Sequence, residues 1–143
     1  MAVSALVDTG AILAVIDHDD RWHAVCTEAF AQLRLPLLCS EAVLTELFYL
    51  VDRNRVEMEV AWEFVHSNAI ALATIEQAEL TRLRNLMSRY RDRPMDFADA
   101  TLVYLAERES MSTVFTVHRA DFETYRIAGK RRFRIVPELS PRS

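Results

Sequence analysis

Four acidic residues lie beside apolar residues in the sequence: Asp8, Glu46, Asp96 and Asp99. A carboxylate among apolar neighbours loses solvation, which raises its pKa unless a cation meets it. If the four converge, they repel one another, so either their pKa values rise or a cation lies among them. Oxygen ligands without histidine or cysteine favour a hard ion, Mg²⁺ or Mn²⁺. Such an ion can activate a bound water for attack on a phosphodiester.

The first two acids have different sequence surroundings. Asp8 directly follows residues 5–7, which are typical of the end of a short buried strand, and open α/β sheets bind ligands beyond their strand ends. A single aspartate after a strand is more often a helix N-cap or a turn residue. Glu46 lies three residues after Val43 and four before Leu50, so its helical neighbours are apolar. It is either a functional acid or a glutamate at the margin of the apolar helix face, from which it reaches water or an arginine.

Asp96 and Asp99 form a pair one helical turn apart, which places both carboxylates on one face near a helix N-terminus. The helix dipole tolerates negative charge there. This dipole effect accounts well for an acidic residue at position 96. It explains Asp99 less well, because Leu102 and Val103 follow it on its own side and give it a core-like environment.

Short apolar runs alternate with helical patterns along the chain. Strands are expected at 5–7, 37–39, 70–75, 113–117 and 134–136. Helices are expected from Thr9 onward and over 21–35, 40–53 (with Ser40 as N-cap), 57–67, 77–90 and 96–109. This alternation favours a single α/β domain over residues 1–143, with a central, largely parallel sheet flanked by helices.

The net charge of −4 conceals an asymmetry between the two halves of the chain. Residues 1–79 carry 4 basic and 13 acidic side chains, whereas residues 80–143 carry 13 basic and 8 acidic ones, so the halves have net charges of −9 and +5. Basic residues crowd two segments of the second half: Arg82, Arg84, Arg89, Arg91 and Arg93, then Arg126, Lys130, Arg131, Arg132 and Arg134. Charge alone leaves two interpretations open, a solvated or salt-bridged face and a phosphate-binding surface.

Composition restricts the class of protein. With 51% apolar residues in 143, and only 2 glycines and 4 prolines, the chain can bury a sizeable core and is not a linker or a disordered segment. Cys26 and Cys39 match no zinc spacing and are expected to be small buried hydrophobes. Neither an export signal nor an apolar run of about 20 residues is visible, so we expect a cytoplasmic protein that does not enter the membrane.

Together these motifs resemble those of PIN-domain ribonucleases, specifically the VapC-type toxins of prokaryotic toxin–antitoxin pairs. Four segments carry the resemblance, in order along nearly the whole chain: Leu6-Val7-Asp8-Thr9, Ser40-Glu41-Ala42-Val43-Leu44-Thr45-Glu46, Asp96-Phe97-Ala98-Asp99-Ala100, and Phe115-Thr116-Val117-His118-Arg119-Ala120-Asp121-Phe122. Each segment is short, but four in order make the match strong. The resemblance implies a three-layer sandwich around the parallel sheet.

Residue roles also follow from the resemblance. It implies that Asp8, Glu46 and Asp99 are metal-site acids for Mg²⁺ or Mn²⁺, with Asp96 as the paired acid. Supporting roles fall to Thr9, Ser40, Thr116 and His118.

The last motif departs from the family pattern. Members usually have an aspartate two residues after the threonine that matches Thr116, and this chain has His118 there. Asp121, three residues further on, could substitute only if the loop turns inward, so a site with a single metal ion, or one in which His118 binds a softer ion, is also open. We expect His118 to be an ordinary surface histidine of the loop; a ligand or proton shuttle is the less common alternative.

The leading hypothesis is therefore a metal-dependent endoribonuclease that acts as the toxin of a type II toxin–antitoxin pair. Its implied partners are an RNA substrate, a cognate antitoxin and a second copy of the chain, with the helices at 41–51 and 57–65 as interface elements. The alternative is a non-catalytic RNA-binding or regulatory PIN module, which the missing aspartate motivates. A phosphohydrolase of small molecules is a weaker third reading, because no glycine-rich phosphate loop is present.

Overall fold

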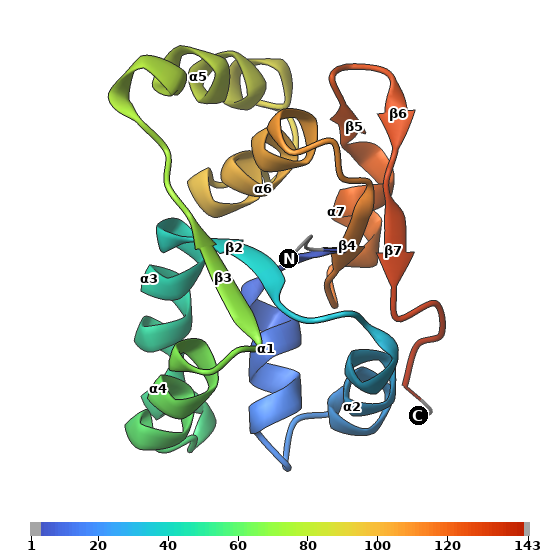
Figure 1. Cartoon of the computed structure of the whole chain (residues 1–143). Coiled ribbons are helices and arrows are strands. Elements are labelled where there is room, and N and C mark those ends of the chain that lie inside the picture. Colours follow the sequence, from blue (N-terminus) through green and yellow to red (C-terminus); the bar gives the residue numbers. More distant parts are fainter. Residues whose placement is uncertain (1–3, 142–143) are drawn as a thin grey trace.

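A sheet of five parallel strands forms the centre of the computed structural model, which describes residues 4–141 (Figure 1). The strands run in the order β3-β2-β1-β4-β7, and each neighbouring pair is parallel. Their bounds are β1 Leu6–Val7, β2 Leu37–Ser40, β3 Ile70–Ala73, β4 Thr113–Phe115 and β7 Arg134–Val136. The predicted α/β class with a parallel sheet is confirmed.

Helices cover both sides of this sheet. In Figure 1, α1, α2, α3 and α4 lie below it, and α5 and α6 lie above it, which gives the expected three layers. The helices are α1 Thr9–Ile16, α2 His23–Gln32, α3 Glu41–Val51, α4 Met58–His66, α5 Leu80–Arg89, α6 Phe97–Arg108 and α7 Arg119–Thr124. Single 3₁₀ turns at Asp52–Asn54 and Gln77–Glu79 follow α3 and precede α5.

The strand order reverses between β1 and β4. From β1 the chain passes outward to β2 and then β3, and it returns through α5 and α6 to β4 on the other side of β1. Connections between parallel strands are right-handed, so this reversal moves the later helices to the opposite face. Ligands in open α/β sheets bind outside the carboxyl ends of the strands at such a reversal. Asp8 and Thr116 directly follow these two strands.

Side chains at the start of three helices fix where each helix begins. Asp8 accepts a hydrogen bond from the backbone N–H of Thr9, Ser40 from that of Val43, and Asp96 from that of Asp99. Such N-caps satisfy backbone donors that have no partner inside the helix. These caps hold the start of α1, α3 and α6 in place, and all three starts face the carboxyl end of the sheet.

The core consists of apolar side chains from the sheet and from the inner helix faces. Leu6, Leu37, Leu47, Leu105 and Phe115 are among the fully buried side chains. Cys26 and Cys39 are free and buried, as expected, and burial raises the pKa of each thiol to about 12. Among the described residues, no helix is long enough and apolar enough to cross a bilayer.

The structure departs from the predicted elements mainly at their ends. The second helix starts two residues late, at His23, because the side chain of Asp20 accepts a hydrogen bond from the N–H of Trp22 and holds a turn there. The helix α7 and a short hairpin were not predicted at all. The hairpin follows α7 and precedes β7 in the chain, and its antiparallel strands are β5 (Arg126–Ile127) and β6 (Arg131–Arg132).

Candidate active site

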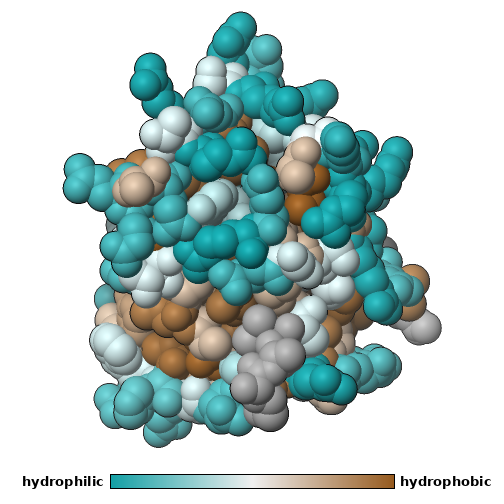
Figure 2. All heavy atoms as spheres, turned by 45° about the horizontal axis from the view of Figure 1, so that its top comes forward, coloured by the Kyte–Doolittle hydropathy of each residue, from teal (hydrophilic) through white to brown (hydrophobic). Residues whose placement is uncertain are grey.

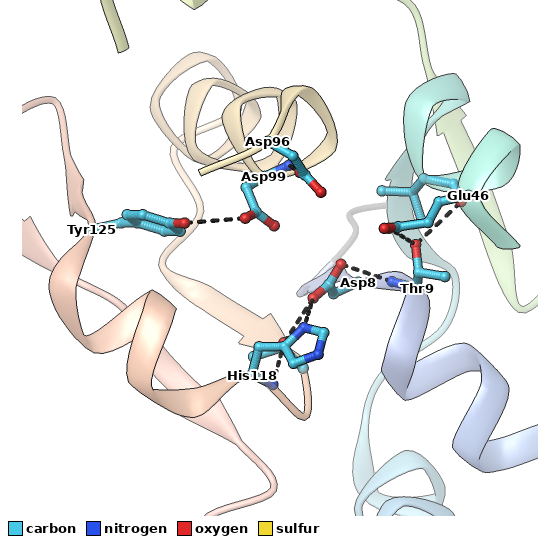
Figure 3. A network of polar contacts seen from close by, with 9 residues as sticks. Asp8, Thr9, Glu46, Asp96, Asp99, His118 and Tyr125 are labelled. Atoms are coloured by element: carbon cyan, nitrogen blue, oxygen red, sulfur yellow. Dashed lines mark hydrogen bonds and ion pairs between the residues drawn. The ribbon is translucent and has the colours of Figure 1, made fainter. Parts of the chain in front are cut away.

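Four acidic side chains from three helices or their caps face one another at the carboxyl end of the sheet (Figure 3). Asp8 caps α1, Glu46 lies on α3, and Asp96 and Asp99 stand at the start of α6. The structure thus brings together all four acids that the sequence singled out. We describe them below as the acidic cluster, defined by these four residues.

Asp8 lies at the centre of the cluster and is almost completely buried. Its Oδ1 accepts a hydrogen bond of 2.8 Å from the N–H of Thr9, and its Oδ2 accepts one of 2.9 Å from the hydroxyl of Thr116. The hydroxyl of Thr116 in turn accepts the N–H of His118 at 3.0 Å. The end of β4 therefore fixes one carboxylate oxygen and the start of α1 fixes the other.

Glu46 is held by the helix that follows β1. The hydroxyl of Thr9 donates to Glu46 Oε1 at 2.7 Å and lies 3.3 Å from the carbonyl of Val43. Partial burial raises the pKa of Glu46, the hydrogen bond from Thr9 opposes this, and the negative charges of Asp96 and Asp8 raise it further. The glutamate therefore turns into the cluster, and no described arginine forms an ion pair with it.

Asp99 is the most perturbed acid of the site. Its side chain is buried, with 9% of the residue exposed, and its Oδ2 accepts a hydrogen bond of 3.1 Å from the hydroxyl of Tyr125. Burial, together with the charges of Asp8 and Asp96, raises the pKa of Asp99 to about 7. Asp96 is solvent-exposed and its Oδ1 accepts the N–H of Asp99 at 2.8 Å. The pair thus combines a capping acid with a desolvated one.

Ser40 does not enter the cluster. Its buried hydroxyl lies 2.8 Å from that of Thr101 and accepts the N–H of Val43 at 3.3 Å. Since Val43 and Thr101 are on α3 and α6, this hydroxyl joins the two helices that carry Glu46 and Asp99. Its contribution is to position the acids.

His118 corrects one expectation from the sequence. Its side chain is 58% exposed, but Nδ1 lies 3.3 Å from Asp8 Oδ2, so the ring is part of the site and is not an ordinary surface side chain. The contact with Asp8 raises the pKa of His118 to about 9, against an opposing effect of burial. A protonated imidazole therefore balances part of the negative charge of the acidic cluster.

Asp121 lies in the first turn of α7, three residues beyond His118. Within residues 4–141, no hydrogen bond or ion pair joins its side chain to the acidic cluster. It acts on the site at longer range, because its charge raises the pKa values of His118 and Tyr125. Within the described chain, His118 and not Asp121 makes the direct contact with Asp8.

Tyr125 was missed from the sequence. It is fully buried, stacks edge-on against Tyr90 and Phe122, and directs its only polar atom at Asp99 (Figure 3). A tyrosine followed by a basic segment carries no signal of such a contact. Only the hydrogen-bonding need of a buried hydroxyl could have indicated that it had a polar partner.

A divalent cation suits the charge of this site. Four carboxylates meet here, and among the described residues one imidazole is the only cationic group bonded to them. Two of the four acids have raised pKa values. The oxygen-only donor set is the one that Mg²⁺ and Mn²⁺ prefer. In the described chain no three acidic, histidine or cysteine side chains are already gathered around one point as a ligand set. The fit to such an ion is therefore one of charge and donor type.

Comparisons with known proteins identify the family and relatives of this chain. The family model described as "PIN domain" matches residues 5–130. Ribonuclease VapC26 of Mycobacterium tuberculosis (strain ATCC 25618 / H37Rv) is 33% identical over 134 residues, which is 92% of this chain and 99% of the relative.

Among solved structures, VapC20 (Rv2549c) of Mycobacterium tuberculosis, described as a sarcin-ricin loop cleaving toxin, superimposes with a TM-score of 0.72. It is 19% identical, with 82% of this chain and 94% of that chain covered, so it shows a shared fold. The family model spans most of the chain and includes all four acids of the cluster, and the sequence resemblance is thereby confirmed: this chain belongs to the PIN domain family.

Proposed function

We propose that this protein is a metal-dependent endoribonuclease that hydrolyses RNA phosphodiesters. The observation that carries the proposal is the acidic cluster at the reversal of the strand order, where burial and mutual repulsion raise the pKa of Asp99 to about 7. A structural role gives no reason to gather four carboxylates, whereas a cation does. The similarity to a protein named a ribonuclease supports RNA as the substrate.

Asp8, Glu46 and Asp99 would hold Mg²⁺ or Mn²⁺, with Asp96 as the paired acid. When bound, such an ion activates a water and stabilises the charge of the departing oxygen. The protein's own groups position the carboxylates: Thr9 orients Glu46, Thr116 orients Asp8 and Tyr125 orients Asp99. Burial of Asp8 and Asp99 excludes bulk water from their oxygens, which strengthens their interactions with charge.

The biological role that we propose is that of a cytoplasmic toxin in a type II toxin–antitoxin pair. The support is the likeness to VapC26 over nearly the full length of both chains. The cognate antitoxin would bind the toxin and cover the acidic cluster, placing a cationic side chain against carboxylates that already repel one another. Co-purification of the two chains and inhibition of RNA cleavage by the antitoxin would test this role.

We also propose a homodimer through α3 and α4. Exposed apolar side chains gather on these helices: Tyr49, Met58, Val60 and Trp62. Trp62 is 53% exposed although its ring centroid lies 4.6 Å from that of Phe48, which leaves aromatic area in solvent. Light scattering at micromolar concentration should give twice the monomer mass of 16.5 kDa, and Trp62→Glu should shift it toward the monomer. A monomeric parent protein would contradict this interface.

Cleavage of a structured RNA pool tests the catalytic proposal directly. Purified protein is incubated with Mg²⁺, with Mn²⁺ and with EDTA, beside Asp99→Asn and Asp8→Asn and beside Asp19→Asn as an exposed control. We expect cutting that needs the metal, survives in Asp19→Asn and disappears in the two cluster variants. Cleavage that persists in both cluster variants would overturn the proposal. If the folded parent binds RNA and does not cut it with either ion, the protein is instead a non-catalytic RNA-binding or regulatory module, and His118 in place of an aspartate is the reason.

A further inference from the structure

Two basic segments that are far apart in sequence meet on one surface. The guanidinium Nη1 of Arg89, at the end of α5, lies 2.8 Å from the position that a Cβ on Gly129 would occupy, in the turn of the β5–β6 hairpin. The N–H of Arg126 donates to the hydroxyl of Tyr90 at 3.0 Å. The end of α5, the loop that follows it and the hairpin are thus in direct contact. We call the exposed cations of this region the basic face: Arg89, Arg91, Arg93, Lys130, Arg131 and Arg132.

Among residues 4–141, no acidic side chain pairs with a cation of the basic face. Within the described chain, four other arginines of the second half pair with carboxylates, in Arg82–Glu107, Arg108–Glu79, Arg119–Glu123 and Arg134–Glu138, whereas Arg84 and Arg126 do not. None of the six cations of the face forms an ion pair with any described residue. Asp92 is the acidic side chain between them in the loop, so the face carries a local excess of positive charge. Figure 2 shows hydrophilic side chains covering this end of the molecule.

In the β5–β6 hairpin, positively charged residues occupy neighbouring positions on the two strands. Arg126 lies directly opposite Arg132 in the antiparallel pair, an arrangement in which like charges destabilise the strands. Arg126 turns back and donates to the carbonyls of Glu123, Thr124 and Tyr125, which leaves Arg132 and its neighbours free for solvent. Ala128 and Gly129 have positive φ and close the turn tightly. Repulsion of this kind is relieved when an external polyanion binds.

The basic face adjoins the acidic cluster. Tyr90 stacks edge-on against Tyr125, with 5.1 Å between ring centroids, and Tyr125 donates to Asp99. The loop that carries Arg91 and Arg93 leads directly into the cap of α6, Asp96. A polyanion lying along the face would therefore reach the carboxylates at its end.

We propose that the basic face binds the sugar–phosphate backbone of the RNA next to the phosphodiester that is cut. This inference rests on the proposed function. All six side chains are cationic, so the face contacts phosphates and not base edges, and its binding is independent of sequence and sensitive to salt. Its role is to hold the strand while the acidic cluster performs the chemistry.

Binding is measured without cleavage, by fluorescence anisotropy of a labelled single-stranded RNA of mixed sequence in EDTA, over a series of NaCl concentrations. The variants are Arg131→Gln/Arg132→Gln and Arg91→Gln/Arg93→Gln. The matched control, Arg21→Gln/Arg34→Gln, removes the same charge from exposed positions outside the face. Each lost phosphate contact lowers the slope of log K against log salt by about 0.7 for a single strand. We therefore expect binding on the order of tenfold weaker at 0.1 M salt in each face variant, and close to the parent value in the control.

Substitution by lysine separates charge from fold. Arg131→Lys/Arg132→Lys should retain most of the affinity and the salt slope, because lysine binds phosphate as a point charge. Face variants that melt like the parent protein and bind RNA with unchanged affinity and slope would overturn the proposal. Because the assay contains no metal, failure of the catalytic proposal leaves this result readable. Conversely, metal-dependent cutting with normal binding by the face variants would reject the basic face alone.

Discussion

The imidazole Nδ1 of His118 lies 3.3 Å from Oδ2 of Asp8, so a cationic side chain at the end of β4 contacts the central carboxylate at the end of β1. This contact raises the pKa of His118 to about 9, from an ordinary value of 6.5. The ion pair partly neutralises the acidic cluster and joins the two strands at the reversal of the sheet order.

The pair predicts a pH-dependent contribution to stability. A base with a raised pKa stabilises the folded chain fully below its unfolded value near 6.5, and this contribution is lost as the pH rises through 9. His118→Ala should therefore lower the free energy of unfolding by about 0.5–1 kcal/mol at pH 6, a value reduced for solvent exposure, and by little at pH 10. Urea unfolding in EDTA measures the difference, with the exposed His66→Ala as control. A loss that is equal at both pH values would contradict the ion pair.

Asp99→Asn should stabilise the protein while it abolishes cleavage. Because the pKa of the folded carboxyl is about 7 and its ordinary value is 3.8, the folded chain binds this proton more tightly, and stability falls as the pH rises through that interval. At pH 8.5 the neutral amide avoids the buried charge and should raise the free energy of unfolding by about 2–4 kcal/mol in EDTA. The gain should shrink toward zero at pH 4. If Asp99→Asn is less stable than the parent at pH 8.5, repulsion does not dominate at this position.

Tyr125→Phe isolates the hydrogen bond to Asp99. Phenylalanine keeps the buried ring against Tyr90 and Phe122 and removes only the hydroxyl donor. A hydrogen bond to a charged carboxylate contributes more to stability than one to a neutral group. We therefore expect a loss of about 1–2 kcal/mol in the free energy of unfolding at pH 8.5. The loss should be smaller at pH 5, where Asp99 is protonated. Since the bond lowers the pKa of Asp99, the pH at which cleavage appears should also move upward. Identical pH profiles for parent and variant would show that the hydroxyl does not act on Asp99.

Gly10 and Val117 should be coupled. A Cβ on Gly10 would lie 2.6 Å from Cγ2 of Val117, which is closer than van der Waals contact allows, so the residue before His118 would have to move. We expect Gly10→Ala to cost about 1 kcal/mol net, because overpacking outweighs the better helix propensity of alanine. In a Val117→Ala background the same change should be neutral or stabilising. A double-mutant cycle measures this coupling, which should be about 1–2 kcal/mol. Additive effects would show that the loop containing Val117 moves without an energetic cost.

Local signals in the sequence explain most of the fold. Asp8, Ser40 and Asp96 each precede a helical pattern and act as caps in the structure, and the short apolar runs become the buried parallel strands. The hairpin and α7 escaped prediction because they are short and rest on tertiary contacts, such as that of Arg126 with Tyr90. Local propensity has little weight in elements of two to six residues.

The candidate site was predictable in composition and not in detail. The four acids could be selected because each lies beside apolar residues, and the topology brings them together. The orientation of His118 could not be predicted, since it depends on Thr116, whose hydroxyl holds both the N–H of His118 and the carboxylate of Asp8. Likewise, Tyr125 reaches Asp99 only through the packing of three aromatic rings. Such contacts between distant residues leave no periodic pattern in the sequence.

The bond between Thr116 and Asp8 spans 108 residues, and that between Tyr125 and Asp99 spans 26. During synthesis on the ribosome, Asp8, Glu46 and Asp99 emerge well before the strand that completes their surroundings. A nascent chain therefore lacks the side chains that hold Asp8 and Asp99 until residues 113–125 have emerged, so the acidic cluster takes its final form late in synthesis.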